Sequence, residues 1–146
     1  MAKKIVITSG FFNPLHIGHM NLMREAKKLG DFLVVIVNND EQVKVKRSKP
    51  FMTEKERLEI VKDIKHVDEV FLSIDIDGYV PESLKAVAEK YGGELIFAKG
   101  GDRNFDNLPE SEKRICRDFN IRVINNVGGG KVQSSSALIE KVADTN

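Results

Sequence analysis

Two histidines stand three residues apart in the stretch SGFFNPLHIGHMN, between an apolar run and a helical pattern. His16 and His19 lie across the first turn of the expected helix, where residues three apart share a face. The N–H groups that begin a helix and the positive end of its dipole favour an anion there. Gly18 lacks a side chain and would let a bulky ligand approach the backbone. This corner therefore predicts a site for a phosphate chain.

Two other interpretations of the pair stay open at this point. A histidine near a helix start is usually an ordinary surface or core group. A zinc pair is conceivable, but zinc sites usually place two histidines four apart on a helix or add further ligands. The third histidine, His66, stands far along the chain, before another apolar run.

Short apolar runs alternate with longer amphipathic ones along the chain. Five runs dense in Val, Ile and Phe predict strands, and most are too apolar for strict alternation, which indicates strands covered on both faces. These runs are KIVITS, FLVVIVN, VDEVFLS, ELIFAK and IRVINN. Because helical patterns separate them, the strands should be parallel and joined by right-handed crossovers.

The helical patterns begin at recognisable start signals. They are the segment from Ile17 to Gly30, one capped by Thr53 to Glu56, one opened by Pro81, one opened by Pro109, and a last short one at SSSALIEKV. The expected fold is a single α/β domain over residues 1–146: a Rossmann-like, doubly wound, five-stranded parallel sheet with helices on both faces. Ligands of such sheets bind beyond the carboxyl ends of the strands, where the strand order reverses.

Composition narrows the classes of function. The chain has 146 residues, of which 41% are hydrophobic and 31% charged, and a net charge of +1. This near neutrality argues against general binding to nucleic acid or to a membrane surface. The start MAKKIVITSG has no secretory signal and one cysteine, Cys116, cannot form an internal disulfide, so we expect a cytoplasmic protein. One local basic cluster, KVKRSK, spans Lys44 to Lys49.

The sequence HIGH at residues 16–19 resembles the signature of the HIGH-motif nucleotidyltransferase superfamily, which includes cytidylyltransferases and adenylyltransferases. The turn before it resembles the pattern G-x-F-[DN]-x-x-H-x-G-H. Further segments are similar to later parts of the cytidylyltransferase-like family, so that the resemblance extends over nearly the whole chain. These segments are LGDFLVVIVNNDE, HVDEV, KGGD and QSSSALI.

The resemblance implies attack by a phosphate oxygen of an acceptor on the α-phosphorus of a nucleoside triphosphate, with pyrophosphate leaving. It implies transfer of CMP or AMP from CTP or ATP to a small phosphorylated acceptor, such as a sugar or polyol phosphate. FMN adenylyltransferase of the small archaeal kind is an alternative. Relatives commonly form homodimers, so we expect one here. Such catalysis depends on aligning two anions and neutralising the charge that develops on the phosphates.

Roles for individual residues follow from the same resemblance. His16 and His19 should hydrogen-bond the triphosphate, with His19 nearest the α-phosphate. Lys44 or Lys46 should reach the phosphates or the acceptor, and Arg57 should contact phosphate. The remaining nucleotide-binding candidates are Ser9, Gly10, Phe11, Phe12, Gly18, Gly100, Gly101, Asp102, Ser134, Ser135 and Ser136.

The resemblance also implies Mg²⁺, which travels with triphosphates and bridges their oxygens. Asn13 stands where many relatives carry Asp, and an amide cannot supply a negative ligand. We therefore expect the phosphates and water to hold the ion, with no metal site made by the protein.

Other classes fit less well. A tRNA synthetase needs an anticodon-binding domain, for which 146 residues leave no room. GGGK at residues 128–131 lacks the spacing of a P-loop, and the first turn lacks the G-x-G-x-x-G of a dinucleotide-binding redox domain. A nucleotide-binding module without catalysis remains the rival from another class, although both histidines, the lysines and the serines favour an enzyme.

Overall fold

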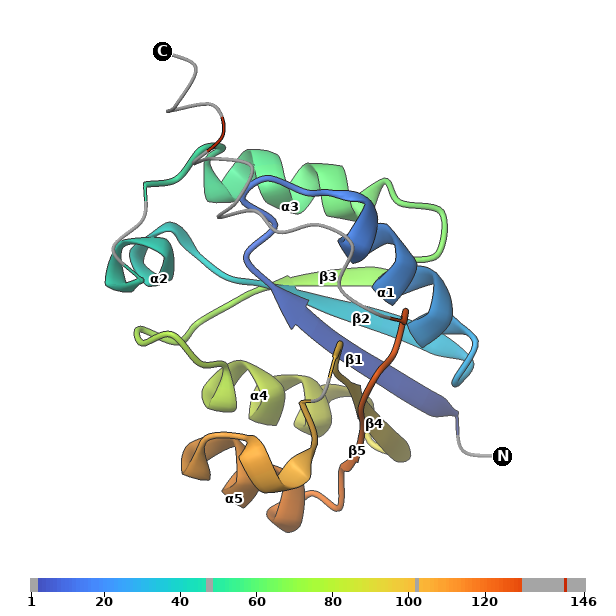
Figure 1. The fold of residues 1–146 in the computed structure, drawn as a ribbon. Coiled ribbons are helices and arrows are strands. Elements are labelled where there is room, and N and C mark those ends of the chain that lie inside the picture. Colours follow the sequence, from blue (N-terminus) through green and yellow to red (C-terminus); the bar gives the residue numbers. More distant parts are fainter. Residues whose placement is uncertain (1–2, 47–48, 102, 130–140, 142–146) are drawn as a thin grey trace.

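Five parallel strands form one sheet in the order β3-β2-β1-β4-β5 (Figure 1). This computed structural model describes residues 3–46, 49–101, 103–129 and 141. The strands are β1 Lys4–Gly10, β2 Phe32–Val37, β3 Glu69–Leu72, β4 Glu94–Ala98 and β5 Arg122–Ile124. The chain runs outward from β1 to β3 and then returns to the other side of β1. The strand order therefore reverses between β1 and β4.

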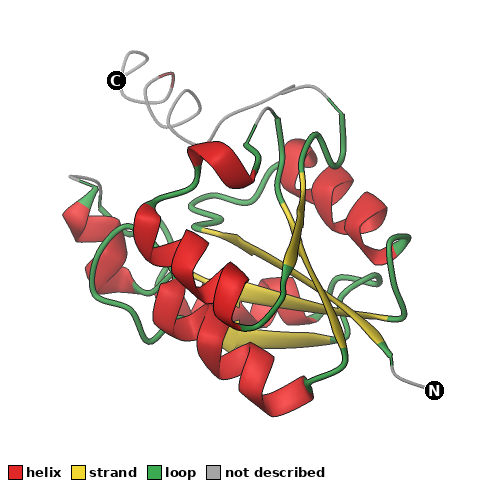
Figure 2. Ribbon diagram, turned by 90° about the horizontal axis from the view of Figure 1, so that it is seen from below, coloured by secondary structure: helices red, strands yellow, loops and turns green. Residues whose placement is uncertain are grey.

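Helices cover both faces of the sheet, as the alternating pattern predicted. The helices are α1 Ile17–Lys27, α2 Asp40–Val45, α3 Glu54–Lys62, α4 Pro81–Tyr91 and α5 Glu110–Asp118. Figure 1 shows α1 and α3 on one face and α4 and α5 on the other. In Figure 2 the sheet is seen from the side of α4 and α5, with the strands behind the helices. A short 3-10 turn, Phe105–Asn107, precedes α5.

Alternate residues of each central strand enter two separate apolar cores, as the period of a strand requires. Val6 and Val35 face the core that contains Met23 of α1 and Val61 of α3. Ile7, Ile36 and Phe97 face the core beneath α4 and α5. The three central strands are thus buried on both faces, which explains their lack of polar alternation.

The expected strands and the first four expected helices are confirmed, most of them with shorter ends, whereas β1 extends one residue further, to Gly10. Thr53 caps α3 by accepting the Glu56 N–H at 3.3 Å, and Pro81 stands at the first position of α4. Helix α2 was missed because a charge run hid the capping box from Asn39 to Gln42. The last expected helix lies almost wholly outside the described residues. None of the helices in the described part of the chain has the length and apolar character needed to cross a bilayer.

The chain after β5 returns to the first helix. Gly128 has a φ of +88°, and a Cβ there would lie 2.8 Å from the Leu22 nitrogen. Only glycine satisfies both the backbone angle and this approach. The segment after β5 is thus anchored on the middle of α1, the helix whose first turn carries the two histidines.

Candidate active site

The two histidines cap the helix that they begin. His16 is the N-cap of α1, and its Nδ1 accepts the Gly18 N–H at 3.1 Å. His19 Nδ1 in turn accepts the His16 N–H at 3.1 Å. Their rings stack with centroids 3.8 Å apart. The sequence suggested unpaired amides in this turn, but the structure corrects this: Gly18 donates to His16, and the His19 amide donates to the His16 carbonyl.

The capping bonds fix where the protons lie on the imidazoles. A nitrogen that accepts an N–H bond carries no proton, so each neutral ring holds its proton on Nε2. Burial and the neighbouring His16 lower the pKa of His19 from 6.5 to about 4. At neutral pH His19 is therefore an uncharged N–H donor at the start of a helix.

The lowered pKa of His19 predicts a dependence of stability on pH. Between pH 6.5 and about 4 the unfolded chain binds a proton at His19 that the folded chain does not. The free energy of unfolding should therefore fall as the pH decreases through this window, and this loss should be absent above it. Chemical denaturation at several pH values measures the slope, and His19→Gln, which does not titrate, should reduce it. Equal slopes for the two proteins would show that folding does not perturb His19.

Aromatic packing holds the turn between β1 and α1. Phe12 is 1% exposed and contacts His19 edge-on, with ring centroids 4.9 Å apart. A Cβ at Gly10 would lie 2.7 Å from the Phe12 ring, so glycine is needed there for packing. Phe12 therefore packs against His19 and helps to position its ring, and Gly10 leaves the space that Phe12 needs. Ser9 is half-buried and follows the buried residues of β1, in register with Ile36.

Asn13 connects this turn to the loop before α3. Its Oδ1 accepts the N–H groups of Phe51 at 2.6 Å and Met52 at 3.2 Å, and its Nδ2 donates to the Lys49 carbonyl at 2.9 Å. The side chain is 4% exposed. An aspartate could accept the two bonds but could not donate the third. The amide thus has a positioning role at this site.

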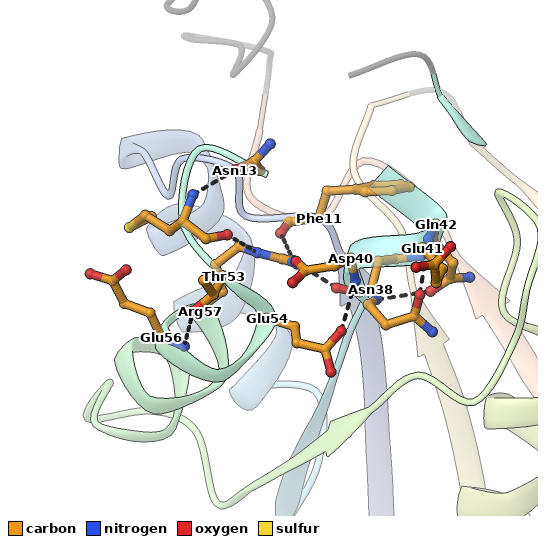
Figure 3. A network of polar contacts seen from close by, with 12 residues as sticks. Phe11, Asn13, Asn38, Asp40, Glu41, Gln42, Thr53, Glu54, Glu56 and Arg57 are labelled. Atoms are coloured by element: carbon orange, nitrogen blue, oxygen red, sulfur yellow. Dashed lines mark hydrogen bonds and ion pairs between the residues drawn. The ribbon is translucent and has the colours of Figure 1, made fainter. Parts of the chain in front are cut away.

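Arg57 lies at the centre of a buried polar network (Figure 3). The residue is 1% exposed. It donates to the carbonyls of Met52 at 2.9 Å, Phe11 at 2.7 Å and Asn38 at 2.6 Å, and it pairs with the Asp40 carboxylate at 2.7 Å. The contact with phosphate predicted for Arg57 stays a prediction. In this structure the guanidinium joins the β1–α1 turn, the end of β2 and the start of α3.

The two candidate lysines of α2 differ in their surroundings. Lys44 is exposed and pairs with Glu41 on the same helix at 3.2 Å. Lys46 is the C-cap of α2, and its Nζ lies 4.3 Å from the centroid of the Phe11 ring. Desolvation, followed by the nearby Arg103, lowers the pKa of Lys46. The structure thus places Lys46 against the β1–α1 turn and Lys44 away from it.

The loop after β4 forms the other side of the switch point. Gly101 has a φ of +60° and leaves open space where a side chain would stand, whereas a Cβ at Gly100 would lie 3.9 Å from the Val127 carbonyl oxygen. Backbone bonds from Asn126 to Gly101 and from Val127 to Lys99 hold the loop against the chain after β5. Four predicted nucleotide-binding residues lie outside the described residues: Asp102, Ser134, Ser135 and Ser136.

A third loop at this edge, between β3 and α4, is held by two side chains that sequence reasoning missed. Asn39 Nδ2 donates to the carbonyls of Ser73 and Asp75, each at 2.9 Å. Gln42 Nε2 donates to the carbonyls of Asp77 at 2.7 Å and Tyr79 at 2.8 Å. The capping box NDEQ was the signal that could have identified both residues.

Comparison with known proteins shows the family and the fold. The model of the cytidylyltransferase-like family matches residues 7–141. An FAD synthase of Thermococcus sibiricus is 35% identical over 98% of this chain and 95% of its own length. The bifunctional protein HldE of Desulfatibacillum aliphaticivorans is 36% identical, over 73% of this chain and 21% of its own length. A lipopolysaccharide core biosynthesis protein from Thermoplasma volcanium has the same fold, with a TM-score of 0.64 at 24% identity over 85% of this chain and 96% of that one.

Proposed function

Because this chain belongs to the cytidylyltransferase-like family of nucleotidyltransferases, we propose that it transfers AMP from ATP to the phosphate of FMN and releases pyrophosphate. The observation that carries the transfer is the stacked histidine pair at the start of α1, in which both Nδ1 atoms are held by capping bonds. Near full-length similarity to FAD synthases supports the acceptor. The comparisons thus favour the acceptor that the sequence left as an alternative.

The surface beside the turn also supports a planar acceptor. Phe51 is 63% exposed, although its backbone N–H is fixed by Asn13. An exposed aromatic ring on a positioned loop can stack on a flat heteroaromatic ring system.

The chain's residues act by holding phosphates in place. His16 and His19 donate to triphosphate oxygens, with His19 nearest the α-phosphate, where charge grows as the acceptor oxygen attacks. Lys46 adds a positive charge at the same edge. The donors are fixed by their capping bonds before nucleotide binds, so little reorganisation is needed during the reaction.

Mg²⁺ accompanies the triphosphate in this proposal. Within residues 3–46, 49–101, 103–129 and 141, no group of three or more His, Cys, Asp or Glu side chains is arranged to hold a metal. Asn13 uses its amide on the loop before α3. The described residues thus do not form a protein ligand set, and we assign the ion to phosphate oxygens and water.

A sugar phosphate is the second candidate acceptor. The similarity to HldE and the KGGD sequence, which resembles the heptose-type adenylyltransferases, favour it. FMN and a sugar phosphate would both accept AMP from ATP through a phosphate oxygen. The two acceptors differ only in the chemical group that is attached to this phosphate.

Thermal unfolding with Mg²⁺ and each of ATP, CTP, GTP and UTP tests the donor. A nucleotide at about 100 times its dissociation constant should add roughly 2.7 kcal/mol to the stability. Stabilisation by ATP, followed by pyrophosphate release with FMN but not with riboflavin, would support the proposal. Stabilisation by CTP alone would contradict the adenylyl donor, and release with sugar phosphates alone would contradict the acceptor.

Lys46 and Lys44 offer a matched test of the basic segment. Lys46→Met should lower kcat/KM by about 10- to 100-fold, because it removes a charged donor beside the β1–α1 turn. Lys44→Met should leave kcat/KM near that of the wild type, since Lys44 pairs with Glu41 at the surface. Steady-state kinetics with varied ATP and acceptor measures both. A larger loss for Lys44→Met would reverse the assignment.

A further inference from the structure

Gln42 is a fully buried amide on α2 that uses both of its N–H donors. Its Nε2 donates to the carbonyls of Asp77 at 2.7 Å and Tyr79 at 2.8 Å. Its Oε1 accepts the Asn39 N–H at 3.1 Å. An oxygen in place of Nε2 would face two carbonyl oxygens, so these bonds allow only one orientation of the amide.

The two bonds hold the tip of the loop between β3 and α4, residues 77–79. Figure 1 shows this loop between α2 and α4. Within the tip, the Tyr79 N–H donates to Asp77 Oδ1 at 3.0 Å. Directly after it, the Val80 N–H donates to Glu112 Oε2 at 2.9 Å. A backbone held at successive residues in this way has lost its conformational freedom before any ligand binds.

The loop tip borders the candidate active site through Lys46, the C-cap of α2. A Cβ added at Gly78 would lie 3.9 Å from Lys46 Cε, and no other atom of the described residues outside 77–79 would lie within 4 Å. Gly78 is not among the glycines with a positive φ, so its backbone does not require glycine. The missing side chain instead leaves open space beside Lys46, whose Nζ lies against the Phe11 ring.

Helix capping alone does not explain an amide at position 42. The capping box uses only the side-chain oxygen, which accepts the Asn39 N–H, and a glutamate would serve equally well there. A glutamate would also interact favourably with the positive end of the helix dipole. Only the loop tip needs the two N–H groups of the glutamine.

We propose that Gln42 is a positioning residue for the acceptor and acts through the loop tip, which forms one wall of the space that the acceptor enters beside Lys46. Gly78 keeps this space open. The inference rests on the proposed function and adds the wall that meets the part of the acceptor beyond its phosphate. The loop before α3, held by Asn13 at the Phe51 N–H, borders the same β1–α1 turn.

The test uses two kinds of substitution. Gln42→Glu keeps the shape and the capping oxygen but loses the two donors, and Gln42→Met removes them without adding a charge. Gly78→Leu fills the open space and removes none of the hydrogen bonds of the tip. Lys85→Leu is the control for Gly78→Leu, because it adds the same side chain at an exposed position of α4.

Three measurements are made on each protein: urea denaturation, FMN binding and steady-state kinetics with varied ATP and FMN. Binding is followed by the anisotropy of the flavin fluorescence, with Mg²⁺ and an ATP analogue that carries an α,β-methylene bridge. Gln42→Glu and Gly78→Leu should each weaken FMN binding by at least about tenfold, since one misplaces the wall and the other fills the space. The KM for ATP should stay within about twofold of the wild type, and Lys85→Leu should bind FMN normally.

Unchanged FMN binding in Gly78→Leu would show that the tip is not a wall of the acceptor space and would overturn the proposal. Equal losses for ATP and FMN in Gln42→Glu would show a general loss of structure, and so would unfolding of both Gln42 variants. Either result would assign Gln42 a purely structural role and overturn its assignment as a positioning residue.

The kinetics separate this inference from the proposed function. If the wild type adenylylates a sugar phosphate and not FMN, the assigned acceptor is wrong, and the same variants are assayed with that sugar phosphate. A KM for the sugar phosphate that rises in Gln42→Glu and Gly78→Leu, but not in Lys85→Leu, would uphold the wall. An unchanged KM would overturn the wall together with the acceptor.

Discussion

Replacing His19 with alanine is expected to lower kcat by about 100- to 1,000-fold, the usual cost of removing a donor aimed at a developing charge. The folded chain should survive, although the change also removes the acceptor for the His16 N–H. Loss of that capping bond should cost about 1 kcal/mol of stability. Turnover and denaturant unfolding of the same preparation measure the two effects separately.

A second substitution at this position separates capping from chemistry. In His19→Glu the carboxylate can accept the His16 N–H, as glutamate does in the ordinary capping box, but it offers no donor to phosphate. This variant should be about as stable as the wild type and should lack turnover. Normal turnover in either variant would exclude His19 from the reaction, while loss of folding in both would assign it a purely structural role.

Replacing Arg57 with methionine is expected to lower the free energy of unfolding by about 3–5 kcal/mol, the largest effect on stability that we expect. The change leaves the Asp40 carboxylate without its ion pair and removes the donor from three backbone carbonyls. Because the side chain is fully buried, water cannot replace these bonds at no cost. Urea denaturation measures the loss.

Arg57→Lys is the informative control. It keeps the charge beside Asp40 but cannot make the forked set of bonds, so it should recover only part of the lost stability. Turnover should fall in both variants, because the Phe11 and Asn38 carbonyls lose their common donor. An unfolding midpoint unchanged in Arg57→Met would contradict the network. If the variants keep their folded stability and lose only affinity for nucleotide, this would support the phosphate contact that the sequence suggested.

The fold could be predicted because apolar runs and helix starts are local signals. The pair at His16 and His19 could be predicted because a short motif places both residues on one helical turn. The buried network around Arg57 could not be predicted from its sequence position, since an arginine on a helix can donate to phosphate or to backbone carbonyls with the same chemistry. Only the fold brings the carbonyls of Phe11 and Asn38 to it.

The surroundings of the lysines likewise could not be predicted from the sequence. The spacing of Lys44 and Lys46 does not tell which one turns toward Phe11, because that depends on where α2 ends. Lys99 carried no signal of its own before two glycines that read as an ordinary turn. Its burial, with 8% of the residue exposed, depends on the parts of the chain that the fold brings around the end of β4.

In the loop between β3 and α4, the backbone is held by side chains from another segment, while several of the loop's own side chains are exposed to solvent. Asn39 and Gln42 hold it through main-chain carbonyls, which every amino acid provides. The side chains of Ile74, Ile76 and Tyr79 are 60%, 82% and 48% exposed and take no part in those bonds. Evolution can therefore exchange these side chains while the path of the loop stays the same. A scaffold of this kind lets one ancestral enzyme diverge toward new substrates without first losing its fold.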